Sequence, residues 1–351
     1  MGLKIDDVVV DRGQHFEEVG ERMYALGLTD GLPVVPPTED RIAKMLDGRD
    51  PALVLATLPP LLGEATLHRV AFCAVMAGCL PEYLPVLIAA VQAVAEDEFN
   101  LLGIQTTTGT AAPAIIVNGP ITQRLGINAG TNALGPGIRS NATIGRALSL
   151  VLRNVGGAIP GELDMATMGQ PGKYTFCFAE NEKASPWEPL HVSRGFDHKQ
   201  STVTVVGAAG TIEVKDDCSK QAESLLTTFA NTMLGAGLVS STGIIGGGNP
   251  LLLLAPNHAR IIAREKNREA TQAFLFEMAR LPLSALSPET QMHLEQHRLI
   301  QHERGGAAEL RVAERPSEIM LVVVGGTGFK STYVPTWGGG THAVTKPVAD
   351  S

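Results

Sequence analysis

Cysteine is scarce in this sequence, with four residues in a chain of 351. So few cysteines cannot form a disulfide scaffold, and a reducing cytoplasm is the expected compartment. Aromatic residues make up only 5% of the chain. The core must therefore consist mainly of Ala, Val, Leu and Ile, which suits sheets that helices cover on both faces.

A basic excess and a long apolar run are also missing. The formal net charge is −8, which argues against a general nucleic-acid binder because no surplus of Lys and Arg can displace counterions. No apolar run approaches the roughly 20 residues of a membrane-spanning helix. The first residues, MGLKIDDVVVD, carry early acids and lack the apolar core of a signal peptide. We expect a cytoplasmic protein that binds a small molecule, not nucleic acid or membrane, and that forms a homo-oligomer or hetero-oligomer.

Several local signatures of catalysis are absent. The segment GGTGFKST resembles a phosphate loop, but Phe329 replaces the glycine that should precede Lys330 and Ser331. The patterns G-x-G-x-x-G, H-E-x-x-H and G-x-S-x-G do not occur. The sequence thus disfavours nucleotide hydrolysis and a hydrolase triad, predicts no metal site and names no cofactor.

Short apolar strands alternate with amphipathic helices, which predicts an α/β fold with mixed or parallel sheets covered by helices. Residues 1–110 are expected to be mainly helical and 111–351 to form the α/β core, either as a second unit or as one continuous domain. Strands are expected at 112–118, 174–179, 201–206, 251–254 and 319–324, and helices at 15–27, 38–46, 65–78, 83–96, 143–154, 221–235, 256–266, 268–280 and 288–302. The segments 113–154 and 249–266 share a strand–turn–helix pattern, but their sequences differ too much to define a repeat.

Ligands of open α/β sheets bind beyond the carboxyl ends of the strands. Three such places carry polar or glycine-rich residues, namely Asn118 with the loop after it, His258 at the start of a helix, and the turn that contains Gly325, Gly326 and Gly328. Consecutive glycine amides can bind an anion, although a tight structural turn is the alternative for the third place.

The loop GINAGTNALGPGIRSNATIGR is long and polar, as binding loops often are. Arg139 suits a planar carboxylate or phosphate, and Asn141 is expected to begin a helix whose amides face the same anion. Asn128 and Asn132 would add donors and acceptors. The alternative is a structural loop whose Asn side chains bind their own backbone.

A second polar segment, GKYTFCFAENEKASPWEPLHVSRGF, follows. Glu180 and Glu182 precede His191, a combination that can move protons in general acid–base catalysis. Lys173, at the start of the segment, is a candidate substrate-binding cation. A surface turn between strands is the alternative.

The cysteines and the remaining histidines are weaker candidates. Cys79 lies between Gly78 and an expected helix start, where a helix N-terminus lowers the pKa of a thiol, so it is a candidate reactive thiol. His293 and His297 stand four residues apart and could bind a metal, but a solvated helix face is favoured.

Four segments together, DGLPVVPPTEDR, VMAGCLPEYLPV, the 126–147 loop and the 172–196 segment, make the chain similar to a bacterial family associated with small thioredoxin-like proteins that carry a UGSC or CGSC peptide. The resemblance implies a two-component enzyme whose thioredoxin-like partner supplies a reactive thiol or selenol. It transfers no catalytic residue to this chain.

The leading hypothesis is an enzyme or catalytic subunit that acts on a small anionic molecule by hydrolase or lyase chemistry. Glu180, Glu182, His191 and His258 would handle protons, and the substrate-binding residues would be Asn118, Asn128, Asn132, Arg139, Asn141 and Lys173. The alternatives are a subunit of a thiol-dependent redox complex and a non-catalytic small-molecule binding subunit.

Overall fold

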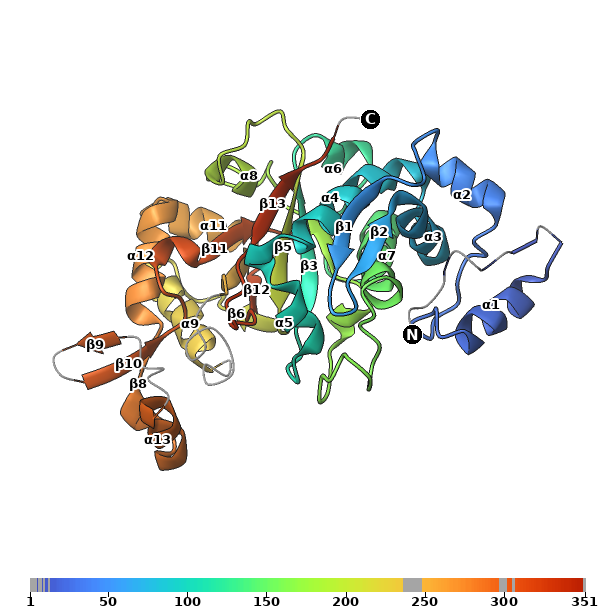
Figure 1. Cartoon of the computed structure of the whole chain (residues 1–351). Coiled ribbons are helices and arrows are strands. Elements are labelled where there is room, and N and C mark those ends of the chain that lie inside the picture. Colours follow the sequence, from blue (N-terminus) through green and yellow to red (C-terminus); the bar gives the residue numbers. More distant parts are fainter. Residues whose placement is uncertain are drawn as a thin grey trace.

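The computed structural model describes residues 5, 8, 10–11, 13–235, 248–296, 302–304 and 307–349. Two stacked β-sheets form the centre of the molecule, and helices cover the outer face of each sheet (Figure 1). The expected α/β class with mixed sheets is thereby confirmed. Among the described residues, no helix is long and apolar enough to span a bilayer.

The first sheet has the order β13-β5-β3-β4, with β13 (Val344–Pro347), β5 (Thr202–Ala208), β3 (Ala112–Asn118) and β4 (Cys177–Ala179). The central strand β3 runs parallel to β4 and antiparallel to β5, and β13 runs antiparallel to β5. The second sheet has the order β11-β7-β12-β6, with β11 (Met320–Val323), β7 (Leu251–Leu254), β12 (Lys330–Val334) and β6 (Ile212–Lys215). Here β7 runs parallel to β11 and antiparallel to β12, and β6 runs antiparallel to β12.

The two sheets therefore share one topology, and each receives its edge strand from the other half of the chain. Strand β6 follows β5 along the chain but pairs in the second sheet, whereas β13 follows β12 and pairs in the first. At the crossing, Ala208 bridges Thr336, the amide of Ala209 donates to Pro335 (2.7 Å), and that of Trp337 donates to Gly207 (2.8 Å). The segments 113–154 and 249–266 thus begin with equivalent strands, an internal correspondence that their sequences do not reveal.

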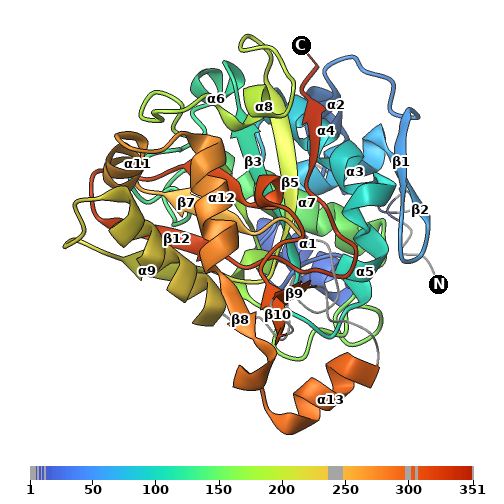
Figure 2. The same ribbon diagram turned by 90° about the vertical axis from the view of Figure 1, so that its left-hand side faces the viewer.

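Side-chain alternation distributes the apolar residues over three cores. Ile116, Val206, Leu253 and Val322 belong to the core between the sheets. Their chain neighbours point outward, so Val117 and Val205 join the core beneath the helices of the first sheet. The helices on the first sheet are α4 (Leu84–Val94), α5 (Leu101–Thr106), α6 (Ile121–Arg124) and α7 (Arg139–Asn154), and α3 (Leu67–Ala77) packs on α7. The helices on the second sheet are α9 (Ala222–Gly235), α11 (Pro256–Ala263) and α12 (Arg268–Met278) (Figure 2).

The N-terminal third packs on the first sheet and shares its core with β3, β5 and β13. It contains α1 (Phe16–Ala25) and α2 (Glu39–Leu46), as expected from their periodicity. It also contains an antiparallel hairpin, β1 (Val54–Leu58) and β2 (Gly63–Thr66), which the expectation of a mainly helical region omitted. The omission has a local cause: the hairpin is short, its first strand is largely exposed, and prolines interrupt its pattern.

Other differences from the expected elements lie at chain segments with weak local signals. Helix α13 covers Pro288–Gln296 among the described residues, and His302, where the expected helix 288–302 ends, instead begins strand β9 (His302–Arg304). Strand β9 belongs to a small sheet with β10 (Ala307–Arg311) and β8 (Arg280–Pro282), which follows α12. His297 lies outside the described residues. Helix α7 begins at Arg139 with Ile138 as its N-cap, so Asn141 does not cap it. Strand β4 (Cys177–Ala179) covers only the second half of the expected strand 174–179, and a 3-10 turn at Pro171–Lys173 ends just before the first half.

Candidate functional site

A buried cluster of polar side chains lies where the parallel strands β3 and β4 end. Asn118 ends β3, Glu180 follows β4, and Thr202 begins β5 opposite Asn118. All three side chains are buried. The loop from residue 181 to 200, which includes the short helix α8 (Leu190–Ser193), covers this end (Figure 1). His191 on α8 contributes a buried ring to the cluster.

Glu180 is the innermost acid of the cluster, with 3% of its surface exposed. One carboxylate oxygen, Oε2, accepts hydrogen bonds from the Asn118 side-chain amide and from the backbone N–H of Leu190, both at 2.7 Å. Burial disfavours the charged form and raises the pKa of Glu180 to about 7, against the opposing effects of these bonds and of the Arg268 guanidinium. Glu180 can therefore exist in both protonation states near neutral pH.

Glu182 lies beside it, nearer to solvent, with 27% of its side chain exposed. Its Oε1 accepts from the Asn118 amide (3.0 Å) and from the backbone N–H of Gly119 (2.7 Å). Gly119 has a φ of +85°, and a Cβ there would collide with the carbonyl of Gln200. Glycine is required at this turn because only a residue without a side chain lets the amide approach Glu182 from this position.

The imidazole of His191 lies on the other side of Glu182, with Nδ1 3.8 Å from Oε1. The ring is fully buried. Burial lowers the pKa of His191, while the neighbouring Glu182 carboxylate raises it. Because the net shift is downward, the neutral imidazole is the expected form at neutral pH.

The cluster contains hydrogen-bonding capacity that no described protein atom uses. The buried side-chain atoms without a partner include Asn118 Oδ1, Glu180 Oε1, Thr202 Oγ1 and both ring nitrogens of His191. Buried polar atoms are paired in the great majority of cases, and exceptions concentrate at functional sites. These five atoms lie at one place in the fold, which marks the cluster as a candidate active site.

The second sheet shows that the fold does not require this polarity. The backbone N–H of Glu180 donates to Val117 on β3, and the N–H of Val324 donates to Leu254 on β7 in the corresponding position. Val324 is thus the counterpart of Glu180, and Ala255, which follows Leu254, is the counterpart of Asn118. The same architecture carries an apolar pair in one half and an acid–amide pair in the other.

Arg268 lies close to the Glu180 cluster, and the sequence analysis did not identify it as a site residue. It begins α12 on the second sheet, is buried, and donates to the carbonyl oxygens of Leu321 (2.8 Å) and Glu188 (2.6 Å). Its charge favours the ionised form of Glu180. Arg268 therefore connects the 181–200 loop to the second sheet by hydrogen bonds. No local sequence motif identifies Arg268, because its two partners lie 53 and 80 residues away in the chain.

The 126–141 loop lies next to β4, since the carbonyl of Asn128 accepts from the N–H of Ala179 (3.1 Å). Its asparagine side chains bind the loop itself. Asn141 accepts from the N–H of Asn128 (2.8 Å) and donates to the Asn128 and Ala133 carbonyls. The side chain of Asn128 donates to Thr131, and that of Asn132 donates to Pro136. These contacts fit the alternative prediction, a structural loop whose Asn side chains form hydrogen bonds with the backbone of the loop.

The two expected substrate-binding cations point elsewhere. Arg139 is exposed and donates through Nε to the carbonyl of Gly78 (3.0 Å). Lys173 forms an ion pair with Asp164 at 2.6 Å. Among the described residues, no hydrogen bond or ion pair connects Arg139 or Lys173 with Glu180, Glu182 or His191.

His258 belongs to a separate buried group on the helix side of the second sheet. Its Nδ1 lies 2.8 Å from Ser331 Oγ and its Nε2 lies 2.8 Å from the carbonyl of Asp216, so both ring nitrogens are engaged. The rings of Phe229 and Phe329 pack against it, and burial lowers its pKa. No contact within the described part of the chain joins His258 to the Glu180 cluster, which favours a structural role.

The glycine turn after β11 packs against the 126–141 loop. The N–H of Gly325 donates to the carbonyl of Ala129 (2.8 Å), and Gly326 has Thr131 Oγ1 where a Cβ would stand. Gly328 is open to its surroundings. The N–H of Gly325, the first of the three glycine amides expected to bind an anion, therefore already has a partner within the protein.

Cys79 does not have the environment expected of a reactive thiol. Helix α3 ends at Ala77, and Cys79 is buried after it, with its thiol donating to the carbonyl of Thr143 (3.3 Å). Burial raises the pKa of Cys79 to about 12, where the sequence suggested a lowered value. Burial also raises the pKa of Cys73 and Cys177, and Cys218 is exposed.

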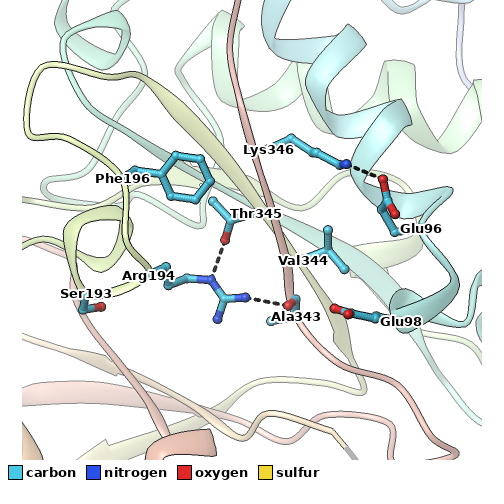
Figure 3. A pocket seen from close by; sticks show the side chains of 9 residues that line it. All are labelled: Glu96, Glu98, Ser193, Arg194, Phe196, Ala343, Val344, Thr345 and Lys346. Atoms are coloured by element: carbon cyan, nitrogen blue, oxygen red, sulfur yellow. Dashed lines mark hydrogen bonds and ion pairs between the residues drawn. The ribbon is translucent and has the colours of Figure 1, made fainter.

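A polar pocket of about 450 Å³ lies beyond α8, between the loop after that helix and β13 (Figure 3). Arg194, three residues after His191, donates to Thr345 Oγ1 (2.6 Å) and to the carbonyl of Ala343 (2.7 Å). On the opposite wall, Lys346 pairs with Glu96, and Glu98 lies nearby.

No group of three or more His, Cys, Asp or Glu side chains suited to a metal ion occurs in the described part of the chain. In the comparisons with known proteins, no family model matched the chain and no curated protein showed significant similarity to it.

Proposed function

We propose that this chain is an enzyme that acts on a small anionic molecule by acid–base chemistry of the hydrolase or lyase type, at the cluster of Asn118, Glu180, Glu182 and His191. The observation that carries the proposal is Glu180, a buried carboxyl whose pKa is raised to about 7 and whose Oε1 has no protein partner. A general acid or base works best when its pKa lies near the operating pH.

We assign a separate role in proton transfer to each group of the cluster. Glu180 would give a proton to the substrate or take one from it through the free Oε1. Glu182 would hold the Asn118 amide and the Gly119 N–H in place, because its Oε1 accepts a hydrogen bond from each. The neutral His191 beside Glu182 would accept a proton, and Glu182 would stabilise the imidazolium that forms.

The proposed anionic character of the substrate now depends on a different cation. Arg139 and Lys173 are engaged away from the cluster. Arg194 follows His191 by one helical turn and presents its guanidinium in the pocket beyond α8 (Figure 3). A carboxylate or phosphate held by Arg194 would direct the rest of a small substrate toward α8 and the cluster.

The redox alternative receives no support from Cys73, Cys79 and Cys177, because these thiols are buried with raised pKa values. Cys218 is exposed, but it has no contact with the Glu180 cluster in the described part of the chain. Cytoplasmic location, oligomer formation and a thioredoxin-like partner remain proposals drawn from composition and from the family resemblance. In that alternative the working thiol would come from the partner, as the resemblance implies.

The test is a turnover screen in D₂O. The chain is incubated with a panel of small carboxylates and phosphate esters, and ¹H NMR follows hydrolysis, elimination and exchange of carbon-bound protons. Glu180→Gln should abolish any conversion found, because it removes the titrating proton while retaining shape. Glu265→Gln, an exposed acid in the turn after α11, is the matched control and should convert at the normal rate.

Two results would contradict the proposal. The first is a converted substrate whose rate Glu180→Gln leaves unchanged. The second is a panel without conversion, combined with a Glu180 carboxyl that titrates near its ordinary value in ¹³C NMR.

A further inference from the structure

A second cavity lies at the opposite end of β3 from Asn118. Its volume is about 570 Å³, within the range of ~300–1,000 Å³ typical of small-molecule sites. The first residues of β3, the last two turns of α7 and the loop from residue 158 to 174 form its walls. No residue of the Glu180 cluster lines it.

Much of the wall is apolar. Pro113, Leu150 and Leu152 are among the lining residues, and Met168 lies at the rim with 88% of its surface exposed. A methionine this exposed is a flexible apolar side chain that can fold over a bound apolar group. The cavity therefore suits a ligand with an apolar body.

A buried amide in the wall lacks a partner. Gln105, on α5, is 7% exposed and lines the cavity, and its Nε2 has no hydrogen-bond partner among the described residues. A buried donor without an acceptor is costly. An acceptor oxygen of a ligand would satisfy it.

Among the charged residues that line the cavity, the two aspartates are paired with cations, whereas Arg153 has no acidic partner among the described residues. Asp164 is paired with Lys173, and Asp30 receives two hydrogen bonds from Arg146 at 2.7 and 2.8 Å. Within the described part of the chain, Arg153, in contrast, donates only through Nε to the carbonyl of Gly27 (3.2 Å), and no carboxylate there lies within 4.0 Å of its guanidinium. Arg153 is thus a lining cation whose charge is not neutralised locally.

We propose that this cavity is a binding site for a small apolar molecule that carries a carboxylate, with Arg153 pairing with the carboxylate and Gln105 donating to an acceptor oxygen. A guanidinium forms strong charge-assisted hydrogen bonds with carboxylates, while the apolar wall holds the body of the molecule. The site is independent of the proposed catalytic cluster, because it lies at the other end of β3.

The test uses two probes of the same shape, 3-phenylpropionate and 3-phenylpropan-1-ol, in calorimetric titrations of the full chain. The carboxylate should bind about tenfold more tightly than the alcohol, and Arg153→Gln should remove that preference. Gln105→Leu should weaken the carboxylate about fivefold by removing the donor. In methyl-labelled protein, the Met168 resonance should shift on binding.

Matched controls separate the site from general charge effects and from the proposed function. Arg124→Gln removes an exposed cation from α6 and should leave both affinities unchanged, as should Glu180→Gln at the cluster. Undetectable binding of 3-phenylpropionate at millimolar concentration, equal affinity for the two probes, or an unchanged affinity in Arg153→Gln would overturn the proposal. Failure here leaves the turnover screen unaffected, and the reverse also holds.

Discussion

The side-chain amide of Asn118 lies 2.7 Å from the carboxylate of Glu180, and both residues are buried where two neighbouring parallel strands end. The same amide nitrogen also donates to Glu182. One amide therefore holds two acids of different exposure side by side. Glu180 is the buried member of the pair, and burial raises its pKa to about 7.

The first prediction concerns the loss of the Asn118 amide, which donates to both Glu180 and Glu182. Asn118→Ala should raise the pKa of Glu180 above about 7, because the hydrogen bond from Asn118 favours the ionised form. It should also cost about 1–3 kcal/mol of stability, since buried acceptors lose their donor. ¹³C NMR titration and urea unfolding measure the two effects. Asn257→Ala, at a half-buried position in the first turn of α11 and away from the cluster, is the control, and equal titration curves for the two variants would contradict the assignment.

The stability of the chain should depend on pH through Glu180. Its folded pKa, about 7, is higher than its ordinary value of 4.5. Below pH 4.5 the carboxyl is protonated in both states and costs nothing. As the pH rises from about 4.5 to about 7, only the unfolded state ionises, and the folded state loses stability, by about 3 kcal/mol in total.

Glu180→Gln removes this titration. The difference in unfolding free energy between variant and wild type should therefore grow in favour of the variant across that window and stay constant above it. Urea denaturation at half-unit pH steps measures the difference, with Glu265→Gln as the control. A difference that does not change between pH 4.5 and 7 would refute the raised pKa.

Backbone geometry at Gly119 yields the third prediction. Gly119→Ala combines a φ of +85° with a collision between the new Cβ and the Gln200 carbonyl, and should destabilise the chain by more than about 2 kcal/mol. Gly126→Ala is a matched control because Gly126 has a φ of +61° but open space around it. It should cost only about 1 kcal/mol. Thermal unfolding compares them, and equal costs would show that the close approach at Gly119 is unimportant.

Thiol accessibility provides the fourth prediction. Cys73, Cys79 and Cys177 are buried and Cys218 is exposed, so a thiol-labelling reagent should modify one cysteine in the native chain at neutral pH and four after denaturation. Cys218→Ser should abolish native labelling. Rapid labelling of Cys79 in that variant would restore the internal-thiol hypothesis.

The regular elements were largely predictable from local pattern. Strand β3 occupies the expected 112–118, and α2 and α9 lie within one residue of the expected bounds. These segments have strong apolar periodicity, which depends only on near neighbours along the chain. The β1–β2 hairpin and the edge strands β6 and β13 were missed because they are short, partly exposed and defined by distant pairing partners.

The candidate site was predictable in part. Asn118, Glu180, Glu182 and His191 were expected from their positions after strand ends and before a histidine, and the structure brings them together. Arg139, Lys173 and His258 were chosen for their chemistry, but their partners Gly78, Asp164 and Ser331 lie away from the cluster. A residue type shows what a side chain can do, whereas its direction depends on packing.

Composition and local order in the chain were enough to establish the α/β class, the aliphatic core and the lack of a membrane-spanning helix in the described part of the molecule. Those properties follow from residue-by-residue preferences. The exchange of edge strands, the burial that raises the pKa of Glu180, and the contrast between Asn118–Glu180 and its counterpart Ala255–Val324 emerged only from the folded molecule. Each depends on contacts between residues far apart in sequence, which periodicity and spacing cannot encode.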